Sequence, residues 1–93
     1  MFFACLFRRA RPRPDLHFTF FTRQGCHLCD DAWALLTKAQ ARHQFRLEAK
    51  DVDTSPKWAA EYGDCVPVVL VNGKVRFRGQ VNEVLLRRIL DAP

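Results

Sequence analysis

Residues 16–29 read LHFTFFTRQGCHLC, and this stretch decides the fold. Its first half, residues 16–22, is rich in aromatic and β-branched residues and is apolar on both faces near its centre. That composition predicts a buried central strand. Arg23-Gln24-Gly25 ends the strand, and a helical pattern begins at Cys26. The close pair Cys26 and Cys29 therefore lies where the predicted strand has ended and the predicted helix begins.

The helix is predicted from residue 26 to about residue 43, because apolar residues recur there at intervals of three or four. Acidic residues stand in its first turn and Arg42 in its last, as the helix dipole favours. One face is expected to be buried, and it carries Cys29, Ala32, Leu36 and Ala39, with Leu28, Trp33 and Leu35 beside it.

The rest of the chain predicts an α/β fold with the order β-α-β-α-β-β-α. Residues 45–50 alternate between apolar and polar, which is typical of an edge strand. Asn72-Gly73 is a strong hairpin signal. The other expected elements are a short helix that Ser55-Pro56 begins and Gly63 ends, strands over 66–71 and 75–78, and a helix over 82–90 with Val84, Leu85 and Ile89 facing the core. A right-handed parallel crossover and an antiparallel hairpin make a four-stranded mixed sheet with helices on both faces.

Length and charge limit the classes of protein that fit. The chain has 93 residues, enough for one domain, and its apolar runs are far shorter than the roughly 20 residues that span a bilayer. The net charge is +5, of which +3 comes from four arginines and one acid in residues 1–16. We therefore expect a flexible basic tail over residues 1–15 and a single domain over residues 16–93. The weak charge of that domain argues against nucleic acid as a partner.

The motif Cys26-His27-Leu28-Cys29 predicts dithiol chemistry. A free cysteine has a pKa of about 8.5 and is mostly protonated at neutral pH, but a helix N-terminus stabilises the reactive thiolate. Cys26 occupies that position, and Cys29 belongs to the buried face one turn on. We expect Cys26 to attack and Cys29 to resolve the adduct, with Arg23 and His27 favouring the thiolate.

A close pair of cysteines also binds metals. A zinc ribbon would need a second CxxC, which the sequence does not have, but a site made from Cys26, Cys29 and Cys65 stays open. The alternative function is therefore a metal or iron–sulfur carrier that uses these three thiols as ligands. A third reading is an adaptor whose dithiol is incidental.

Residues 16–92 resemble the glutaredoxin-like branch of the thioredoxin superfamily, and three segments carry the resemblance. Residues 21–29 look like the strand end and dithiol motif. Cys65-Val66-Pro67 looks like the Thr-Val-Pro segment, whose proline is cis. Residues 78–82, RGQVN, look like the Gly-Gly-x-Thr/Ser-Asp segment that opens the last helix.

The resemblance implies roles for further residues. It implies a cis peptide at Val66–Pro67, whose backbone would pair with an extended substrate beside the dithiol. It places Cys65 near Cys26, and we hypothesise that Cys65 is a third redox thiol. The residues that it assigns to substrate or glutathione are Arg23, Cys65, Val66, Pro67, Gly79 and Asn82.

The chain departs from the family's pattern in two segments. His27-Leu28 stands where Pro-Tyr is usual between the cysteines. In the last segment Arg78, Val81 and Asn82 replace a glycine, a hydroxyl residue and an aspartate, so a hydroxyl and a charge expected to hold glutathione are gone. Arg23 matches the basic position that contacts glutathione's glycine carboxylate.

The sequence thus predicts a thiol–disulfide oxidoreductase that reduces protein disulfides or glutathione mixed disulfides. We expect no bound cofactor and no metal, with electrons coming from glutathione or from a reductase. We expect a monomer whose partners are disulfide-containing proteins or glutathione, and neither nucleic acid nor membrane. Residues 1–7 are apolar and precede the arginines, the reverse of a secretory leader, so we expect a cytoplasmic protein.

Overall fold

The computed structural model describes residues 11–93. Its principal elements are β1 (His17–Thr22), α2 (His27–His43), β2 (Arg46–Asp51), α3 (Pro56–Tyr62), β3 (Val68–Val71), β4 (Lys74–Arg78) and α4 (Glu83–Asp91). The strands form one sheet in the order β2-β1-β3-β4. β1 lies parallel to β2 and antiparallel to β3, and β3 lies antiparallel to β4. This is the predicted mixed sheet, with β1 inside it and β2 at an edge.

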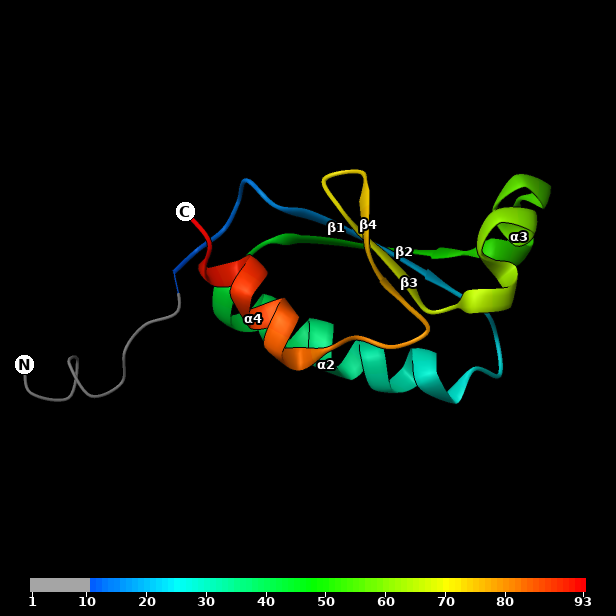
Figure 1. Cartoon of the computed structure of the whole chain (residues 1–93), viewed down its shortest axis with the longest axis horizontal. Coiled ribbons are helices and arrows are strands. Elements are labelled where there is room, and N and C mark those ends of the chain that lie inside the picture. Colours follow the sequence, from blue (N-terminus) through cyan, green and yellow to red (C-terminus); the bar gives the residue numbers. More distant parts are fainter. Residues whose placement is uncertain (1–10) are drawn as a thin grey trace, which may run out of the picture.

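The sheet has a core on each face because side chains alternate along β1. Phe18 and Phe20 belong to the larger core, between the sheet and helices α2 and α4, which cover the same face (Figure 1). Phe21 points the other way, and its ring stacks on Tyr62 of α3 at 4.5 Å between centroids. Burial raises the pKa of the Tyr62 hydroxyl. Residues of β1 thus contribute to the cores on both faces of the sheet.

The buried face predicted for α2 is confirmed for its central residues, but two of the residues predicted beside it are exposed. Cys29, Ala32 and Leu36 are at most 2% exposed. Leu28, however, is 51% exposed, because α4 begins only at Glu83, which faces Leu35, and so does not reach Leu28. Trp33 is 37% exposed although its ring contacts Phe20.

Two further expectations differ from the structure. Val84 is 63% exposed, because Leu86, Ile89 and Leu90 form the buried face of α4 and Val84 falls on the opposite side. β3 begins at Val68 and not at residue 66, because Val66 and Pro67 form a loop with a cis peptide bond. The end of α3 is as expected: Tyr62 is its last residue and Gly63 its C-cap, with φ −55° at the start of a 3₁₀ turn.

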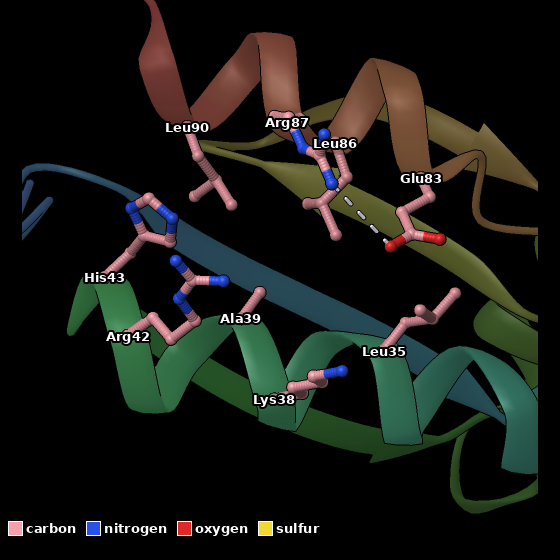
Figure 2. Close-up of a pocket in the computed structure, with 9 residues that line it drawn as sticks. All are labelled: Leu35, Lys38, Ala39, Arg42, His43, Glu83, Leu86, Arg87 and Leu90. Carbon is pink, nitrogen blue, oxygen red and sulfur yellow. Dashed lines mark ion pairs between the residues drawn. The ribbon is translucent and has the colours of Figure 1, made fainter. Parts of the chain in front are cut away.

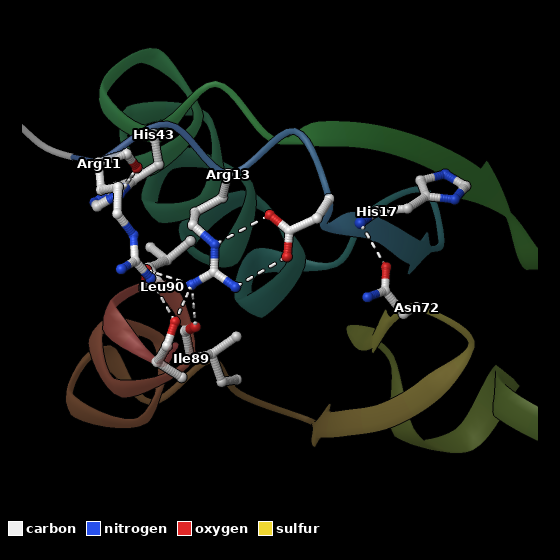
Figure 3. A network of polar contacts seen from close by, with 9 residues as sticks. Arg11, Arg13, His17, His43, Asn72, Ile89 and Leu90 are labelled. Atoms are coloured by element: carbon white, nitrogen blue, oxygen red, sulfur yellow. Dashed lines mark hydrogen bonds and ion pairs between the residues drawn. The ribbon is translucent and has the colours of Figure 1, made fainter.

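The N-terminal segment of the described chain is seated on the domain (Figure 3). The Arg13 guanidinium is buried and donates to the carbonyls of Leu90 and Ala92 at 2.8 and 2.6 Å, and to Asp15 on its other side. Residues 1–10 of the predicted tail lie outside the described residues. From Arg11 onward, the part of that tail which the structure describes contacts the domain. Across residues 11–93, no helix has the length and apolarity needed to cross a membrane.

Candidate functional site

The two cysteines of the CxxC motif lie at the start of α2, just beyond the end of β1. Cys26 is the residue that caps the helix, and its Sγ accepts a hydrogen bond from the Cys29 backbone N–H at 3.1 Å. The two cysteines are joined as a disulfide, with Cα atoms 5.2 Å apart. Cys26 is half-buried and Cys29 is 2% exposed. The geometry therefore separates an accessible sulfur from an inner one, as the helical spacing predicts.

The position of Cys26 favours a thiolate once the disulfide is reduced. The first N–H groups of a helix have no partner within the helix, and the helix dipole is positive at that end. The Cys29 N–H already points at the Cys26 sulfur. A thiolate there would gain a charge-assisted hydrogen bond, and such bonds are stronger than bonds between neutral groups.

Arg23 lies in the loop before the dithiol, but its charge is paired. Its Nε and Nη2 donate to the two carboxylate oxygens of Asp53 at 3.0 and 2.9 Å, and its Nη1 donates to the Gly63 carbonyl at 3.0 Å. Hydrogen bonding to Asp53 raises the pKa of Arg23 above its ordinary value. Arg23 therefore ties the loop before the CxxC motif to the segments on either side of α3, and its positive field at Cys26 is reduced by Asp53.

Gly63 makes this contact possible. A Cβ built on Gly63 would lie 2.9 Å from Nη2 of Arg23, closer than real Cβ atoms approach other atoms. Asp53 and Gly63 lie 30 and 40 residues from Arg23 in the chain. No local pattern pointed to either of them, and the only signal was a glycine where α3 was expected to end.

Within residues 11–93, His27, the second residue predicted to favour the thiolate, makes no side-chain hydrogen bond or ion pair. His27 is the first residue of α2 and is exposed to solvent. Asp30 stands in the first turn and donates its backbone N–H to the Cys26 carbonyl at 3.2 Å. The role of His27 in favouring the thiolate stays a prediction.

The cis-proline loop brings four of the predicted residues together: Cys65, Val66, Pro67 and Gly79. The Val66–Pro67 peptide bond is cis, as the resemblance implies. The Gly79 N–H donates to the carbonyls of Cys65 and Pro67 at 2.9 and 2.8 Å, so the end of β4 is fastened to this loop. Val66 and Cys26 are both partly buried and pack against the larger core.

Cys65 is a free, half-buried cysteine that packs with Phe21 and Tyr62 in the smaller core. The guanidinium of Arg78 contacts its sulfur at 3.5 Å. Arg78 is the residue that replaces the first glycine of the family's last motif. Nothing in the sequence indicated that Arg78 contacts Cys65.

In the segment over residues 78–82, Val81 and Asn82 have structural roles. The Asn82 side chain caps α4 by accepting the Leu85 backbone N–H at 2.9 Å. Val81 is 6% exposed and belongs to the larger core. These contacts explain why an amide and an apolar residue serve at these two positions.

Within residues 11–93, no three His, Cys, Asp or Glu side chains gather closely enough to hold a metal ion. The structure thus does not bring the sulfurs of Cys26, Cys29 and Cys65 together as the ligand set that the alternative function requires.

Comparison with known proteins gives consistent matches. A family model described as "Glutaredoxin-like domain (DUF836)" matches residues 17–91. An uncharacterized protein of Mycobacterium tuberculosis is 32% identical over 83 residues, which cover 84% of this chain and 81% of that one. A protein of Dictyostelium discoideum described as glutaredoxin-like is 27% identical over 75 residues, 74% of this chain and 69% of its own.

Solved structures show the same fold. A solution structure of a Nitrosomonas europaea protein matches with a TM-score of 0.71 and 26% identity, covering 82% of this chain and 92% of that one. A crystal structure of an X. campestris protein matches with a TM-score of 0.66 and 29% identity, covering 82% and 97%. A thioredoxin variant of Halobacterium salinarum matches with a TM-score of 0.65 and 19% identity, covering 84% and 74%, and shows the fold alone.

Proposed function

The chain belongs to the glutaredoxin-like domain family (DUF836) of the thioredoxin superfamily, and from that premise we propose that it is a thiol–disulfide oxidoreductase whose dithiol is Cys26 and Cys29. The observation that supports the proposal most is the arrangement of the two sulfurs at the start of α2. Cys26 caps the helix and accepts the Cys29 N–H, while Cys29 is enclosed by the core. An accessible thiolate backed by an inner thiol is what disulfide exchange requires.

The proposed reaction has two steps. The Cys26 thiolate attacks one sulfur of a substrate disulfide, a mixed disulfide forms, and the second substrate sulfur leaves as a thiolate. The Cys29 thiolate then attacks Sγ of Cys26, which closes the Cys26–Cys29 disulfide and releases the first substrate sulfur as a thiolate. Two electrons pass from the dithiol to the substrate. Two glutathione molecules, or the dithiol of a reductase, return them.

The cis-proline loop supports the positioning of the substrate. Val66 borders the same core as Cys26, and the fastening of Gly79 to the Cys65 and Pro67 carbonyls keeps this loop in place. We propose that the Val66 backbone pairs with an extended segment of the substrate beside the mixed disulfide. Protein disulfides and glutathione mixed disulfides are both substrates under this proposal.

A single-turnover experiment tests the proposed function without knowledge of the natural reductant. The reduced protein is mixed with an equal amount of a test protein that carries one accessible disulfide, and free thiols in the test protein are followed by mass spectrometry. We expect the wild type to reduce the disulfide and Cys26→Ser to be inert. Cys5→Ser, the same change at a cysteine to which no role is assigned, is the matched control. Equal reduction by wild type and Cys26→Ser would overturn the proposal.

A further inference from the structure

A groove of about 170 Å³ runs between α2 and α4, on the face of the sheet that these two helices cover (Figure 2). Its floor is apolar: Leu35 and Ala39 of α2 are half-buried there, and Leu86 and Leu90 of α4 lie beneath them at 4% and 3% exposed. Its rim is charged and exposed. The groove lies outside the dithiol site, and nothing in the proposed redox reaction uses it.

The lining residues repeat once per helical turn on both walls. On α2 the apolar pair and the basic pair, Lys38 and Arg42, are each spaced by four residues. On α4 the charged pair, Glu83 and Arg87, and the apolar pair have the same spacing. Side chains four residues apart lie about 5–6 Å from each other and form a ridge along the helix. The ridges of α2 and α4, with apolar side chains between them, form a groove that can receive a side-chain ridge of a third helix.

The rim carries an excess of positive charge. The Arg87 guanidinium pairs with Glu83 at 4.0 Å, and both side chains are largely exposed. In the part of the chain that the structure describes, Lys38 and Arg42 form no ion pair within 4.0 Å. The helix dipole accounts for a cation at Arg42, which stands in the last turn of α2, but not for the cations at Lys38 and Arg87. The groove therefore favours an acidic occupant.

The N-terminal segment of the described chain lies near one end of the groove, where His43 is part of the lining. The Arg11 carbonyl contacts the His43 ring Nδ1 at 3.1 Å, and the Arg11 guanidinium donates to the Ala92 carbonyl (Figure 3). Arg11 thus bridges the C-terminal ends of α2 and α4.

We propose that the α2–α4 groove docks an amphipathic helix of a partner protein, with an apolar ridge seated between the helices and acidic residues facing Lys38, Arg42 and Arg87. Cys26 and Ala39 lie on the same helix, 13 positions apart, which corresponds to about 20 Å. A helix docked in the groove leaves Cys26 open and holds its protein nearby. The proposal stands on the groove alone and does not depend on the redox function.

A designed peptide pair tests the charge and shape of the groove. The probe is a fluorescein-labelled helical peptide with leucine once per turn and glutamate on both flanks, and its matched control carries lysine in place of each glutamate. We expect the acidic peptide alone to bind at low salt, by fluorescence anisotropy, with affinity that falls as salt is added. Amide NMR shifts of the labelled protein should move at residues 35–43 and 83–90.

Matched variants locate the binding. Lys38→Glu with Arg87→Glu should weaken binding of the acidic peptide by about tenfold or more, because rim charges of the wrong sign repel it. Lys57→Glu with Arg88→Glu changes the net charge equally, but neither residue lines the groove. We expect this control to change affinity by less than about threefold. Circular dichroism melts establish that both double variants fold.

Several outcomes would overturn the proposal. These are equal binding of both peptides, equal loss in both double variants, or NMR shifts confined to residues outside the groove. Binding of vesicles of anionic phospholipid that is lost in Lys38→Glu/Arg87→Glu, without binding of the acidic peptide, would assign the groove to a lipid surface. A dimer in sedimentation that the same variant dissociates would assign it to a second copy of the chain.

Discussion

Cys26 combines the features that a reactive cysteine needs, and most of them follow from its place at one helix end. Its sulfur accepts a backbone N–H, its side chain is partly accessible, and its partner Cys29 is enclosed. Arg23, which was predicted to favour the thiolate, is paired with a carboxylate. The backbone and dipole of α2 therefore provide the stabilisation of the thiolate that the structure supports most directly.

We predict that the pKa of reduced Cys26 is lower in the folded protein than in the unfolded chain, where a free cysteine has a pKa of about 8.5. The measurement is the rate of iodoacetamide alkylation at Cys26 against pH, resolved by peptide mass spectrometry. The same profile in concentrated urea is the control, since it removes the helix but keeps the sequence. Identical midpoints in the two profiles would contradict the prediction.

The limits of sequence reasoning at this scale are illustrated by Arg23. Its proximity to Cys26 in sequence suggested a free positive charge beside the thiolate. The structure instead pairs it with Asp53 and Gly63, which are distant in sequence. Motif spacing predicted Cys26 and Cys29 because one helix sets their geometry. It could not predict pairings that depend on how α3 packs against the loop.

At the scale of elements, the C-terminal end of α4 depends on a residue from the opposite end of the chain. The last carbonyls of a helix have no partners within it, and the residue that caps α4, Ala92, is not in the left-handed conformation. Arg13 donates to the carbonyls of Ile89, Leu90 and Ala92 while Asp15 holds its other edge. The arginine-rich segment thus has a structural role that its composition alone did not indicate.

Arg13→Ala should lower the free energy of unfolding by about 2–3 kcal/mol, because it leaves buried carbonyls without a charged donor. Chemical denaturation followed by circular dichroism measures this. Arg11→Ala removes an exposed arginine two residues away and should cost well under half as much. Equal losses in the two variants would show that Arg13 does not anchor α4.

Asp15 gives this anchor a dependence on pH. Hydrogen bonds from Arg13 lower the pKa of the Asp15 carboxyl. A carboxyl whose pKa is lowered on folding stabilises the fold above its unfolded pKa, about 3.9, and that stabilisation is lost as pH falls through the folded pKa. Asp15→Asn should therefore lower Tm at neutral pH and flatten its fall in acid. Tm measured over a pH series checks this, with Asp31→Asn, which alters an exposed carboxylate, as the control. A steep acid limb retained in Asp15→Asn would contradict the assignment.

At the scale of the whole molecule, the sheet could be predicted because each strand carried its own signal. Aromatic density marked β1 as internal, alternation marked β2 as an edge, and Asn72-Gly73 marked the hairpin, whose two residues both have positive φ. The exposure of Leu28 and Val84 and the α2–α4 groove could not be predicted, because they depend on where α4 begins relative to α2. The placement of the positive charge in the fold could not be predicted either. Part of the net charge of +5 lies at the groove and at the C-terminal end of α4.

The central claim, that Cys26 attacks and Cys29 resolves, is tested most directly by trapping the mixed disulfide. Reduced Cys29→Ser protein is mixed with an oxidised test protein, quenched with acid, and mapped by mass spectrometry. The account predicts one covalent adduct, at Cys26, which persists in Cys29→Ser and collapses to the Cys26–Cys29 disulfide in the wild type. An adduct at Cys65, or no adduct while the wild type reduces the same disulfide, would contradict it.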